Sequence, residues 1–390
     1  MLALKLAYLN LKGAGIRTWL NVIVLSLSYV LIIWTQGLYR GMNEQASQAM
    51  IAYEIGGGQF WYKSYDPYDP LTIEDSHGVL PDDIVSLIQS EKATPILIHQ
   101  GVIYPEGRVL PILIKGIDPN QKILKIPSES LIIEEDILPL VIGRRMSEST
   151  SLNIDDFITI RWRDKFGTFD AMEGKVVKIM DTEVQSIDSG QIWVPLKRLR
   201  EMTLLNDEAT VIVVSKDEES FTDSKYFIFK DHAFLLSDLR AMVRTKSVSA
   251  SFMYIILLFL AMIAIFDTQI LSVFKRRKEI GTLIALGMTR KRVVYLFTLE
   301  GAMHGLLSFG FAALYGLPLL IVTRLYGFKI PKASESFGFA ISDRLFPVYG
   351  AGLITGTTLI IMITVTVVSY LPSSKIAALR PTDALKGKVT

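Results

Sequence analysis

The stretch FKRRKEIGTLIALGMTRKRVVYLF, Phe274–Phe297, places two basic clusters on either side of a short segment with helical apolar spacing. The side chains of Ile280, Leu283, Ile284 and Met288 fall broadly on one side of a helical wheel. The stretch also separates two long apolar runs, which predicts a short charged helix between two membrane-spanning helices. A plain connector needs only the charges, so we interpret EIGTLIALG as a docking surface.

Outward from this stretch, four apolar runs are long enough to cross a bilayer, whose hydrocarbon core needs about 20 helical residues. The chain of 390 residues is 50% hydrophobic, with a mean hydropathy of +0.36. Membrane helices are predicted at residues 19–39, 249–274, 293–323 and 346–371. The first run is too long for a cleavable signal sequence and is expected to be a permanent anchor.

Lysine and arginine gather in three places, at residues 5–17, 275–292 and 375–388. The positive-inside rule therefore places both termini and segment 275–292 in the cytoplasm. Residues 40–248 and the short loop 324–345 fall on the opposite side. Residues 1–18 are predicted to form an amphipathic helix on the cytoplasmic membrane face, or alternatively the fraying start of the first membrane helix. Residues 372–390 form a cytoplasmic tail.

The fold class is therefore a helical membrane protein with four transmembrane helices and a large α+β domain at residues 40–248. Alternating β-branched and aromatic residues predict strands at QFWYKSY, GTFDAMEGKVVKIMD and ATVIVVS, and a hairpin at ATPILIHQGVIYPEGRVLPILIKGIDP. Helices are predicted at LPDDIVSLIQSEK and over LPLVIGRRMSESTS, before a turn at Asn153–Asp156. The glycines Gly56–Gly58 follow a predicted helix, so they indicate a helix end and not a phosphate loop.

Several kinds of chemistry are not supported by the sequence. There is no cysteine, which excludes disulfides and thiolate sites. The four histidines have no paired spacing, so no metal site is predicted. Neither a G-x-x-x-x-G-K-[ST] loop nor a G-x-S-x-G elbow is present, so we predict no catalytic residue and no cofactor bound by this chain. The basic residues flank membrane runs, so no nucleic-acid partner is expected.

Two ionisable residues, Asp267 and Glu300, lie inside apolar runs, each about two helical turns from the basic segment. A charge at that depth costs several kcal/mol unless it is paired or hydrated. One interpretation is a proton path. The other is a polar clasp against the basic segment or partner helices, which we favour because a proton path would need an acid nearer the bilayer midplane.

Two motifs resemble a known family. RRKEIGTLIALGMTRKRV, Arg276–Val293, resembles the coupling helix of FtsX/MacB-type (type VII) ABC transporter permeases, in which the run is close to R-R-x-E-I-G-x-x-x-A-L-G-x-T-x-x-x-I. YLPSSKIAALRPTDALKG, Tyr370–Gly387, resembles the family ending P-x-x-x-A-x-x-x-x-P-x-x-A-L. The layout of one helix, a large external domain and three further helices is also similar. The resemblance implies that segment 275–292 docks on an ATPase through Arg276, Arg277, Glu279, Ile280, Gly281, Ala285, Leu286, Gly287, Thr289 and Arg290.

The resemblance also implies a function. The chain would be a non-catalytic permease subunit in the inner membrane, with its large domain in the periplasm. Two permeases, the same or homologous chains, would pair with two separate ABC ATPase subunits, which bind the ATP and Mg. ATP hydrolysis would then drive motion of the external domain, a process called mechanotransmission.

Within the family, IKGIDP, LPLVIGRRMSESTSLNIDDFITI and IDSGQIWVPLKRLREM resemble stretches of the lipoprotein-releasing LolC/LolE permeases. The sequence departs from their pattern at Ile154–Asp156, where IDD replaces an expected GD. This resemblance implies extraction of lipoproteins from the inner membrane for a periplasmic carrier and the outer membrane. The alternatives are an FtsX-like transmitter that regulates a periplasmic cell-wall hydrolase, and MacB-like export of another amphiphile.

Lipoprotein extraction would need work, since each acyl CH₂ withdrawn from the bilayer costs about 0.8 kcal/mol. A cavity between facing helices of two permeases, open to membrane lipids, would hold the acyl chains. Tyr29, Trp34 and Phe252 are the candidate cavity residues. Packing or lipid-facing roles are the alternative for each of them.

Overall fold

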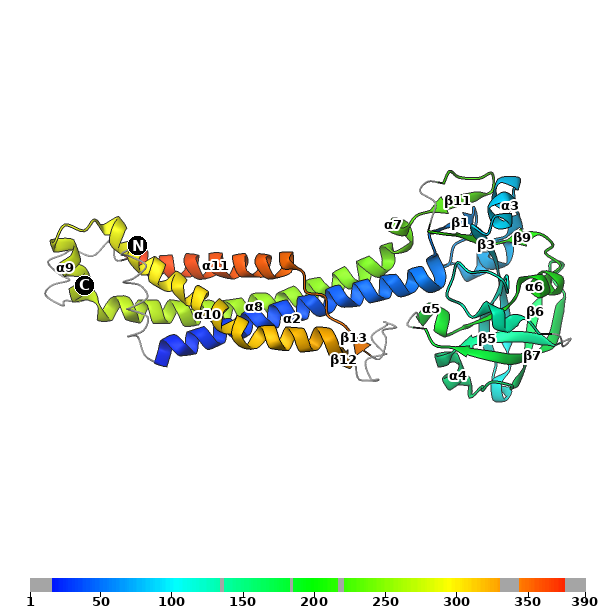
Figure 1. Cartoon of the computed structure of the whole chain (residues 1–390), viewed down its shortest axis with the longest axis horizontal. Helices are drawn as coiled ribbons and strands as arrows, with labels where there is room; N and C mark the ends of the chain where they lie inside the picture. Colours follow the sequence, from blue (N-terminus) through cyan, green and yellow to red (C-terminus); the bar gives the residue numbers. More distant parts are fainter. Residues whose placement is uncertain (1–15, 134–136, 183–184, 217–220, 330–343, 376–390) are drawn as a thin grey trace. The chain divides into compact units, whose positions relative to one another are not determined.

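The computed structural model describes residues 16–133, 137–182, 185–216, 221–329 and 344–375. The predicted amphipathic segment before residue 16 and the tail after residue 375 lie outside this description. The chain divides into two compact units (Figure 1). We call residues up to 42, 242–329 and from 344 onward the helical unit, and residues 43–241 the sheet unit.

Four helices are long and apolar enough to cross a membrane, as the hydropathy pattern predicts. They are α2 (Ile16–Met50), α8 (Ser237–Lys275), α10 (Arg290–Tyr326) and α11 (Ala351–Ser374). Two short strands, β12 (Phe328–Lys329) and β13 (Arg344–Leu345), pair between α10 and α11.

The helix bounds differ from the apolar runs, most of all at the start of α8, which begins at Ser237 and not at residue 249, and in α2 and α11. The first helix continues beyond residue 39 through a π-helical turn, η1 (Ile51–Ile55), and ends at Gly56, whose φ of +62° favours glycine. Backbone hydrogen bonds can continue a helix through polar residues as well as apolar ones, so the apolar run marked only part of it. The last helix begins at Ala351 and not at residue 346, because Pro347 has no N–H and Gly350 takes an extended conformation as the N-cap.

The helical unit packs around one core. Side chains from all four helices meet there: Leu25, Tyr29, Val30, Ile32, Tyr254, Ala261, Ile265, Ala312, Ile361, Val365 and Val368. Helices α10 and α11 lie side by side (Figure 1). Small residues permit this approach, since a Cβ added at Gly301 would lie 2.1 Å from Ser369 Oγ and one at Gly305 would lie 2.8 Å from Met362 Sδ.

The sheet unit contains eleven strands in the part of the chain that the structure describes. Its strands are β1 (Gly58–Tyr62), β2 (Gly78–Val79), β3 (Ala93–Ile103), β4 (Leu110–Ile117), β5 (Leu138–Gly143), β6 (Phe157–Arg163), β7 (Phe169–Met180), β8 (Gln191–Pro195), β9 (Glu208–Ala209), β10 (Val211–Val214) and β11 (Phe227–Lys230). Its helices are α3 (Asp82–Gln89), α4 (Arg144–Thr150), α5 (Gln185–Asp188), α6 (Leu196–Thr203) and α7 (His232–Leu235), with short turns η2 (Pro70–Asp75), η3 (Pro105–Gly107) and η4 (Ser128–Leu131).

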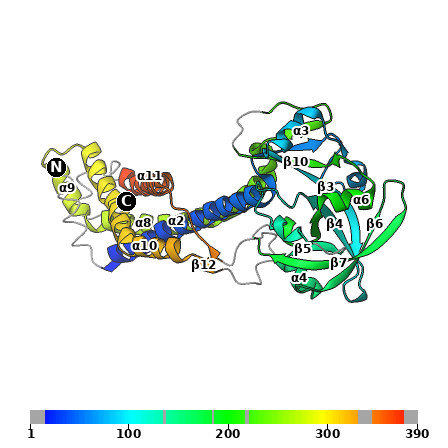
Figure 2. The same ribbon diagram turned by 45° about the vertical axis from the view of Figure 1, so that its right-hand side comes forward.

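The main sheet has the strand order β11-β1-β10-β3-β4-β8-β5-β7-β6, and a further pairing joins β3 to β6. Strands β3, β4, β8, β5, β7 and β6 therefore close into a ring, while β10, β1 and β11 extend from the first half of β3. Alternate residues point to opposite faces of each strand, so Ile112 and Ile114 fill the inside of the ring, whereas Ile96 and Ile98 belong to a second core. Helix α6 contacts β4 and β3 (Figure 2).

Most strand predictions in this unit are confirmed, including the hairpin of β3 and β4 around Pro105–Gly107. One helix prediction is wrong. The residues LPLVIG form strand β5, and only Arg144–Thr150 of the predicted helix is helical. Strand β5 lies between β8 and β7 and is buried on both faces. A short continuous apolar run of this kind has no periodicity that separates a strand from a helix.

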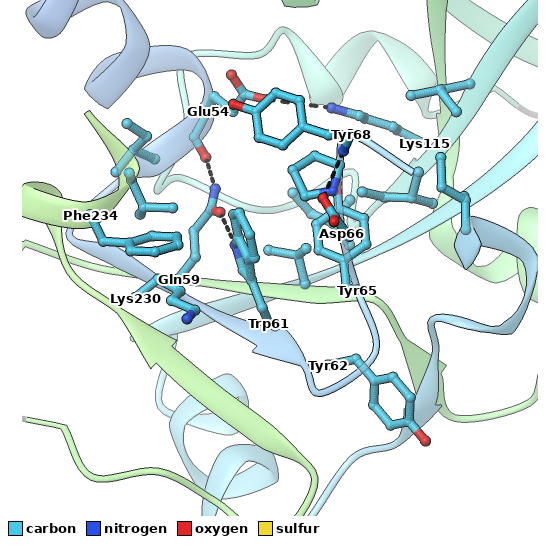
Figure 3. A pocket seen from close by; sticks show the side chains of 18 of the residues that line it. Glu54, Gln59, Trp61, Tyr62, Tyr65, Asp66, Tyr68, Lys115, Lys230 and Phe234 are labelled. Atoms are coloured by element: carbon cyan, nitrogen blue, oxygen red, sulfur yellow. Dashed lines mark hydrogen bonds and ion pairs between the residues drawn. The ribbon is translucent and has the colours of Figure 1, made fainter. Parts of the chain in front are cut away.

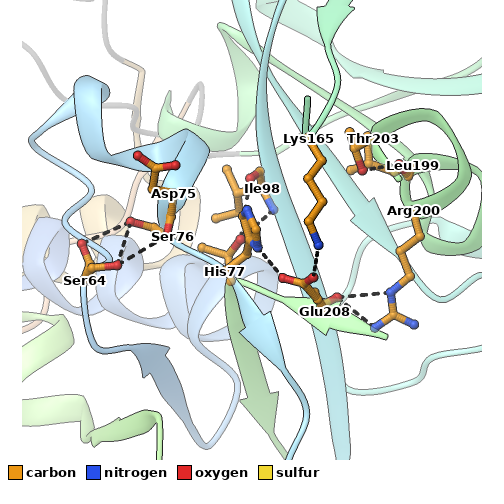
Figure 4. Close-up of polar contacts among 11 residues, drawn as sticks. Ser64, Asp75, Ser76, His77, Ile98, Lys165, Leu199, Arg200, Thr203 and Glu208 are labelled. Atoms are coloured by element: carbon orange, nitrogen blue, oxygen red, sulfur yellow. Dashed lines mark hydrogen bonds and ion pairs between the residues drawn. The ribbon is translucent and has the colours of Figure 1, made fainter. Parts of the chain in front are cut away.

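A polar cluster around Glu208 connects distant segments of the sheet unit (Figure 4). Its carboxylate contacts His77 and lies 3.5 Å from Lys165 Nζ, and its backbone carbonyl accepts hydrogen bonds of 3.0 and 2.9 Å from the Arg200 guanidinium. The pairing of β2 with β9 lies at the same place. Every charged group in the cluster has a counterpart, so we interpret it as structural.

Candidate functional site

The stretch Phe274–Phe297 contains α9 (Arg277–Ala285), a short helix between α8 and α10. Ile280 is fully buried and packs in a small core with Val273, Val293 and Phe297, against which Ile284 and Met288 also pack. The apolar side of the helical wheel is therefore turned toward α8 and α10. It anchors the helix and does not form the exposed surface that the sequence suggested.

The end of α9 is closed by a Schellman motif. The N–H of Gly287 donates to the carbonyl of Ile284 at 3.0 Å, and the N–H of Met288 donates to that of Leu283 at 3.0 Å. Gly287 has a φ of +96°, a conformation that favours glycine. The second glycine of the motif thus fixes the sharp turn from α9 into α10.

Arg276 joins the three helices at the other end of α9. Its Nε lies 2.7 Å from Glu279 Oε2, its Nη1 lies 2.9 Å from Glu300 Oε2, and its guanidinium carbon lies 5.0 Å from the centre of the Phe297 ring. Glu300 is almost completely buried on α10. Planar guanidinium groups suit such multiple contacts, so Arg276 clamps α9 to α10.

The residues predicted to contact an ATPase separate into two groups. Ile280 and Gly281 are buried, and Arg276 is partly buried. The remaining members with described side chains are exposed: Glu279, Ala285, Leu286, Gly287, Thr289 and Arg290. Leu286 is 81% exposed, an unusual state for an apolar side chain on a clamped helix. The side chain of Arg277 lies outside the described part of the structure.

The two predicted intramembrane acids have different surroundings. Glu300 contacts Arg276, whereas Asp267 is exposed on α8. The structure does not bring them together. Sequence reasoning missed His304 and Ser308, which are buried on the same side of α10, although their spacings of four and eight residues from Glu300 are a helical signal. His304 Nδ1 donates to the carbonyl of Glu300 at 3.2 Å.

The candidate cavity residues also lie in different settings. Tyr29 is completely buried in the core of the helical unit and makes an edge contact with Phe309 at 5.9 Å between ring centres. Trp34 is partly buried and makes an edge contact with Phe328 at 5.7 Å. Phe252 is 66% exposed on α8. Tyr29 therefore has a packing role in this conformation, and Phe252 is available to lipid or to a partner.

The helical unit has the features of a membrane permease: four membrane-length helices and a clamped short helix between the second and the third. Residues 251–381 match the family model described as FtsX-like permease C-terminal. The chain is also 22% identical, over 414 aligned residues, to the macrolide export ATP-binding/permease protein MacB of Haemophilus ducreyi. The chain thus contains an FtsX-like permease domain and is homologous to MacB, a type VII ABC permease.

The alignment with MacB covers 97% of this chain and 55% of that relative. The chain therefore spans about half the length of the curated relative that it matches. Residues 251–381 contain α9 together with its clamp, Arg276 and Glu300.

Proposed function

We propose that this chain is the permease subunit of an ATP-driven, mechanotransmitting ABC complex, with the exposed side of α9 as the surface that receives motion from the ATPase. The observation that carries this proposal is the combination of an exposed Leu286 with a buried Ile280 on one short, clamped helix. An apolar tip on a firmly held helix suits insertion into a pocket of a partner.

The clamp gives this surface a way to transmit force. A displacement of α9 must move α8 and α10, because Arg276 contacts Glu300 and Ile280 packs against Val273 and Val293. Helix α8 continues without interruption from Ser237 to Lys275 and carries residues of both units. In this proposal, ATP closes the ATPase, α9 shifts, and the motion passes along α8 to the sheet unit.

The proposed assembly follows from the same family relationship. The 390 residues contain no P-loop, so ATP and Mg would be bound by an ABC ATPase outside these residues, expected as a separate subunit. A second permease, the same or a homologous chain, would complete the complex. We place it in the inner membrane with the sheet unit in the periplasm, as the distribution of lysine and arginine indicates.

For the substrate, we propose an amphiphile, with a lipoprotein handed to a periplasmic carrier as the first candidate. The stretches that resemble Lol permeases supply strands β4, β5 and β8, which are neighbours in the sheet. Their glycines make close packing contacts: a Cβ at Gly143 would lie 2.3 Å from the Asp188 carbonyl oxygen, and one at Gly116 would lie 3.0 Å from Leu199. These motifs therefore support the fold of the unit more than a particular substrate.

MacB-like export of another amphiphile is the second candidate, favoured by the similarity to a protein described as a macrolide exporter. An FtsX-like transmitter that moves a periplasmic hydrolase and transports nothing is the remaining alternative. The three differ in what leaves the membrane when ATP is hydrolysed.

The docking test uses Leu286→Asp, with Leu71→Asp as the matched control. Both leucines are exposed, at 81% and 89%, but Leu71 lies in η2 of the sheet unit. We expect Leu286→Asp to reduce ATPase recovered in a gentle detergent pull-down by about tenfold or more, the range of a lost central apolar contact. Equal recovery from both variants would refute docking through this surface.

The same pull-down distinguishes the substrates when retained material is identified by mass spectrometry. Acylated peptides released from native membranes by ATP would support lipoprotein extraction. An outer-membrane export partner would support the MacB-like alternative, and a cell-wall hydrolase with no released substrate would support the transmitter.

A further inference from the structure

The sheet unit contains a partly open cavity of about 830 Å³, which the proposed coupling to an ATPase does not use (Figure 3). It lies on the face of β4 and β8 that is outside the ring of strands, and it is bordered by β1, the segment 63–68 and the start of α8. Small-molecule sites typically have volumes of roughly 300–1,000 Å³. The cavity is therefore large enough for a compact organic ligand.

Aromatic side chains form one side of the cavity. Trp61 makes edge contacts with Tyr65 and Phe234, at 5.1 and 5.7 Å between ring centres. The hydroxyl of Tyr68 donates to Asp238, which raises the pKa of Tyr68 to about 12. Rings in this arrangement offer both faces and edges to an apolar molecule.

The lining of the cavity also carries a buried cation, Lys115. Its Nζ lies 3.7 Å from Glu54 Oε1 and 5.3 Å from the centre of the Trp193 ring, its partner in the β4–β8 register. An ammonium group has three N–H donors, and 3.7 Å exceeds the usual length of an N–H···O hydrogen bond. Glu54 thus balances the charge and engages only part of the donor capacity of the ammonium group, and burial lowers the pKa of Lys115.

Two further donors on β8 lack a partner. Among the described residues, the indole N–H of Trp193 and the side-chain amide nitrogen of Gln191 are buried without a hydrogen bond. Both residues are about 1% exposed, and both line the cavity. By contrast, Trp61 donates to Gln59 at 2.6 Å. Buried polar groups without partners are uncommon and costly, so a cluster of unfilled donors indicates a missing acceptor.

The acids around the cavity are already engaged. Asp66 accepts a hydrogen bond of 2.9 Å from the N–H of Tyr68, Asp238 accepts from its hydroxyl, and Glu54 pairs with Lys115. Unfilled donors therefore remain on the Lys115 side, which favours a ligand with acceptor oxygens over a cationic one.

We propose that this cavity binds a small apolar molecule that carries an anionic oxygen group, such as an aromatic or short aliphatic carboxylate. The carboxylate would lie at Lys115, near the N–H donors of Trp193 and Gln191, and the apolar body would lie between Trp61, Tyr65 and Phe234. This site does not depend on the proposed ATPase coupling and would allow a free small acid to bind to the sheet unit.

The test uses the full chain in phosphatidylcholine nanodiscs, with binding followed by ¹⁹F NMR of 6-fluoro-2-naphthoate and by competition with octanoate. Empty nanodiscs measure partitioning into lipid, and 2-naphthalenemethanol is the uncharged control probe. We expect saturable binding of naphthoate beyond the empty discs and at least tenfold weaker binding of the alcohol, because a hydrogen-bonded charge contributes about that factor or more. Competition by octanoate separates a general apolar acid site from an aromatic one.

The variant Lys115→Met should weaken naphthoate binding by about tenfold or more, whereas Lys122→Met should not change it. Lys122 is a suitable control because its side chain is 81% exposed and pairs with Glu91 outside the cavity. If Lys115→Met fails to fold, the double variant Glu54→Gln/Lys115→Met removes both charges of the pair.

Trp193→Phe deletes an unpartnered buried donor and should weaken naphthoate binding. The smaller ring also leaves space in the core and costs stability, so binding is compared on variant protein shown to be folded. The proposal is overturned if naphthoate binds no better than to empty discs, if the alcohol binds equally well, or if Lys115→Met and Lys122→Met behave alike. None of these outcomes affects the ATPase pull-down, so the two proposals fail separately.

Discussion

The helical unit and the sheet unit each turn a cation inward, and they hold it in opposite ways. Arg276 has two carboxylates within 2.9 Å and the Phe297 ring beside it. Lys115 has one carboxylate at 3.7 Å and stands among donors without partners. A cation whose donors are filled by its own chain stabilises a structure, whereas one whose donors are left open provides a place for a ligand. The contrast separates the clamp from the proposed binding site.

The largest expected loss of stability comes from removing Arg276 from its ion pair with Glu300. Arg276→Met leaves Glu300 buried without its arginine, and we expect a loss of about 3–5 kcal/mol in the free energy of unfolding. The measurement is the thermal unfolding midpoint and the folded yield of the full chain in detergent. Arg276→Met combined with Glu300→Gln should recover much of the loss, because no buried charge remains.

Lys115→Met is the counterpart in the sheet unit and should cost far less, about 1 kcal/mol or below. Its partner Glu54 keeps 27% of its side chain exposed and can be hydrated when the lysine is gone. Equal losses from Arg276→Met and Lys115→Met would mean that the two cations are held alike, which would remove the contrast.

A middle-sized effect tests how tightly the helical unit is packed around the clamp. Gly301 is next to Glu300, and an added Cβ would lie 2.1 Å from Ser369 Oγ and 2.3 Å from its Cβ. We expect Gly301→Ala to cost about 1–3 kcal/mol, since α10 and α11 must move apart. Thermal unfolding in detergent measures it, with Gly310→Ala as the control on the same helix, because the space around Gly310 is open. A Gly301→Ala variant as stable as the control would show that this contact gives way easily.

The smallest effect concerns a buried base in the sheet unit. Burial lowers the pKa of His99 below its ordinary value of 6.5, and its Nε2 donates to the carbonyl of Arg163 at 2.6 Å. Below pH 6.5 the unfolded chain takes up a proton that the folded chain resists, so stability falls as pH decreases, by about 1.4 kcal/mol for each unit of pKa difference.

His99→Gln keeps an N–H donor but does not titrate, so its unfolding midpoint should change less than that of the natural chain between pH 7.5 and 5.5. Thermal unfolding followed by tryptophan fluorescence measures both slopes. Parallel slopes would assign the acid sensitivity to other groups.

The two units also differ in how much the sequence predicted. The prediction of four helices long and apolar enough to cross a membrane is confirmed, because about 20 consecutive apolar residues have few alternatives to a helix in a bilayer. Strand β5 was predicted as a helix because its pattern is uniform, and the closure of β3 onto β6 has no local signal. Long-range pairing depends on residues far apart in the chain, which no window of sequence contains.

The candidate sites show the same division. The motif EIGTLIALG correctly marked a short helix between two long apolar helices, whereas the turn at its second glycine, Gly287, was found only in the structure. A helical wheel does not show which side of that helix packs against its neighbours. Ile280 was therefore grouped with the docking residues, although it is a core residue. The ion pair of Arg276 and Glu300 joins residues 24 positions apart, one at the N-cap of α9 and one on α10, and needs the packing of α9 against α10.

The number of long apolar helices, the position of α9 and the resemblance to FtsX/MacB-type permeases could be read from the sequence, because each of these depends on residues close together in the chain. Which residues of α9 face outward, and which acid on α10 pairs with Arg276, depended on the packing of the folded chain. This packing also assembled Glu54, Lys115 and Trp193 from three separate segments around one cavity. Burial and unfilled hydrogen-bond donors are properties of the packed chain, and they appear only when distant segments meet.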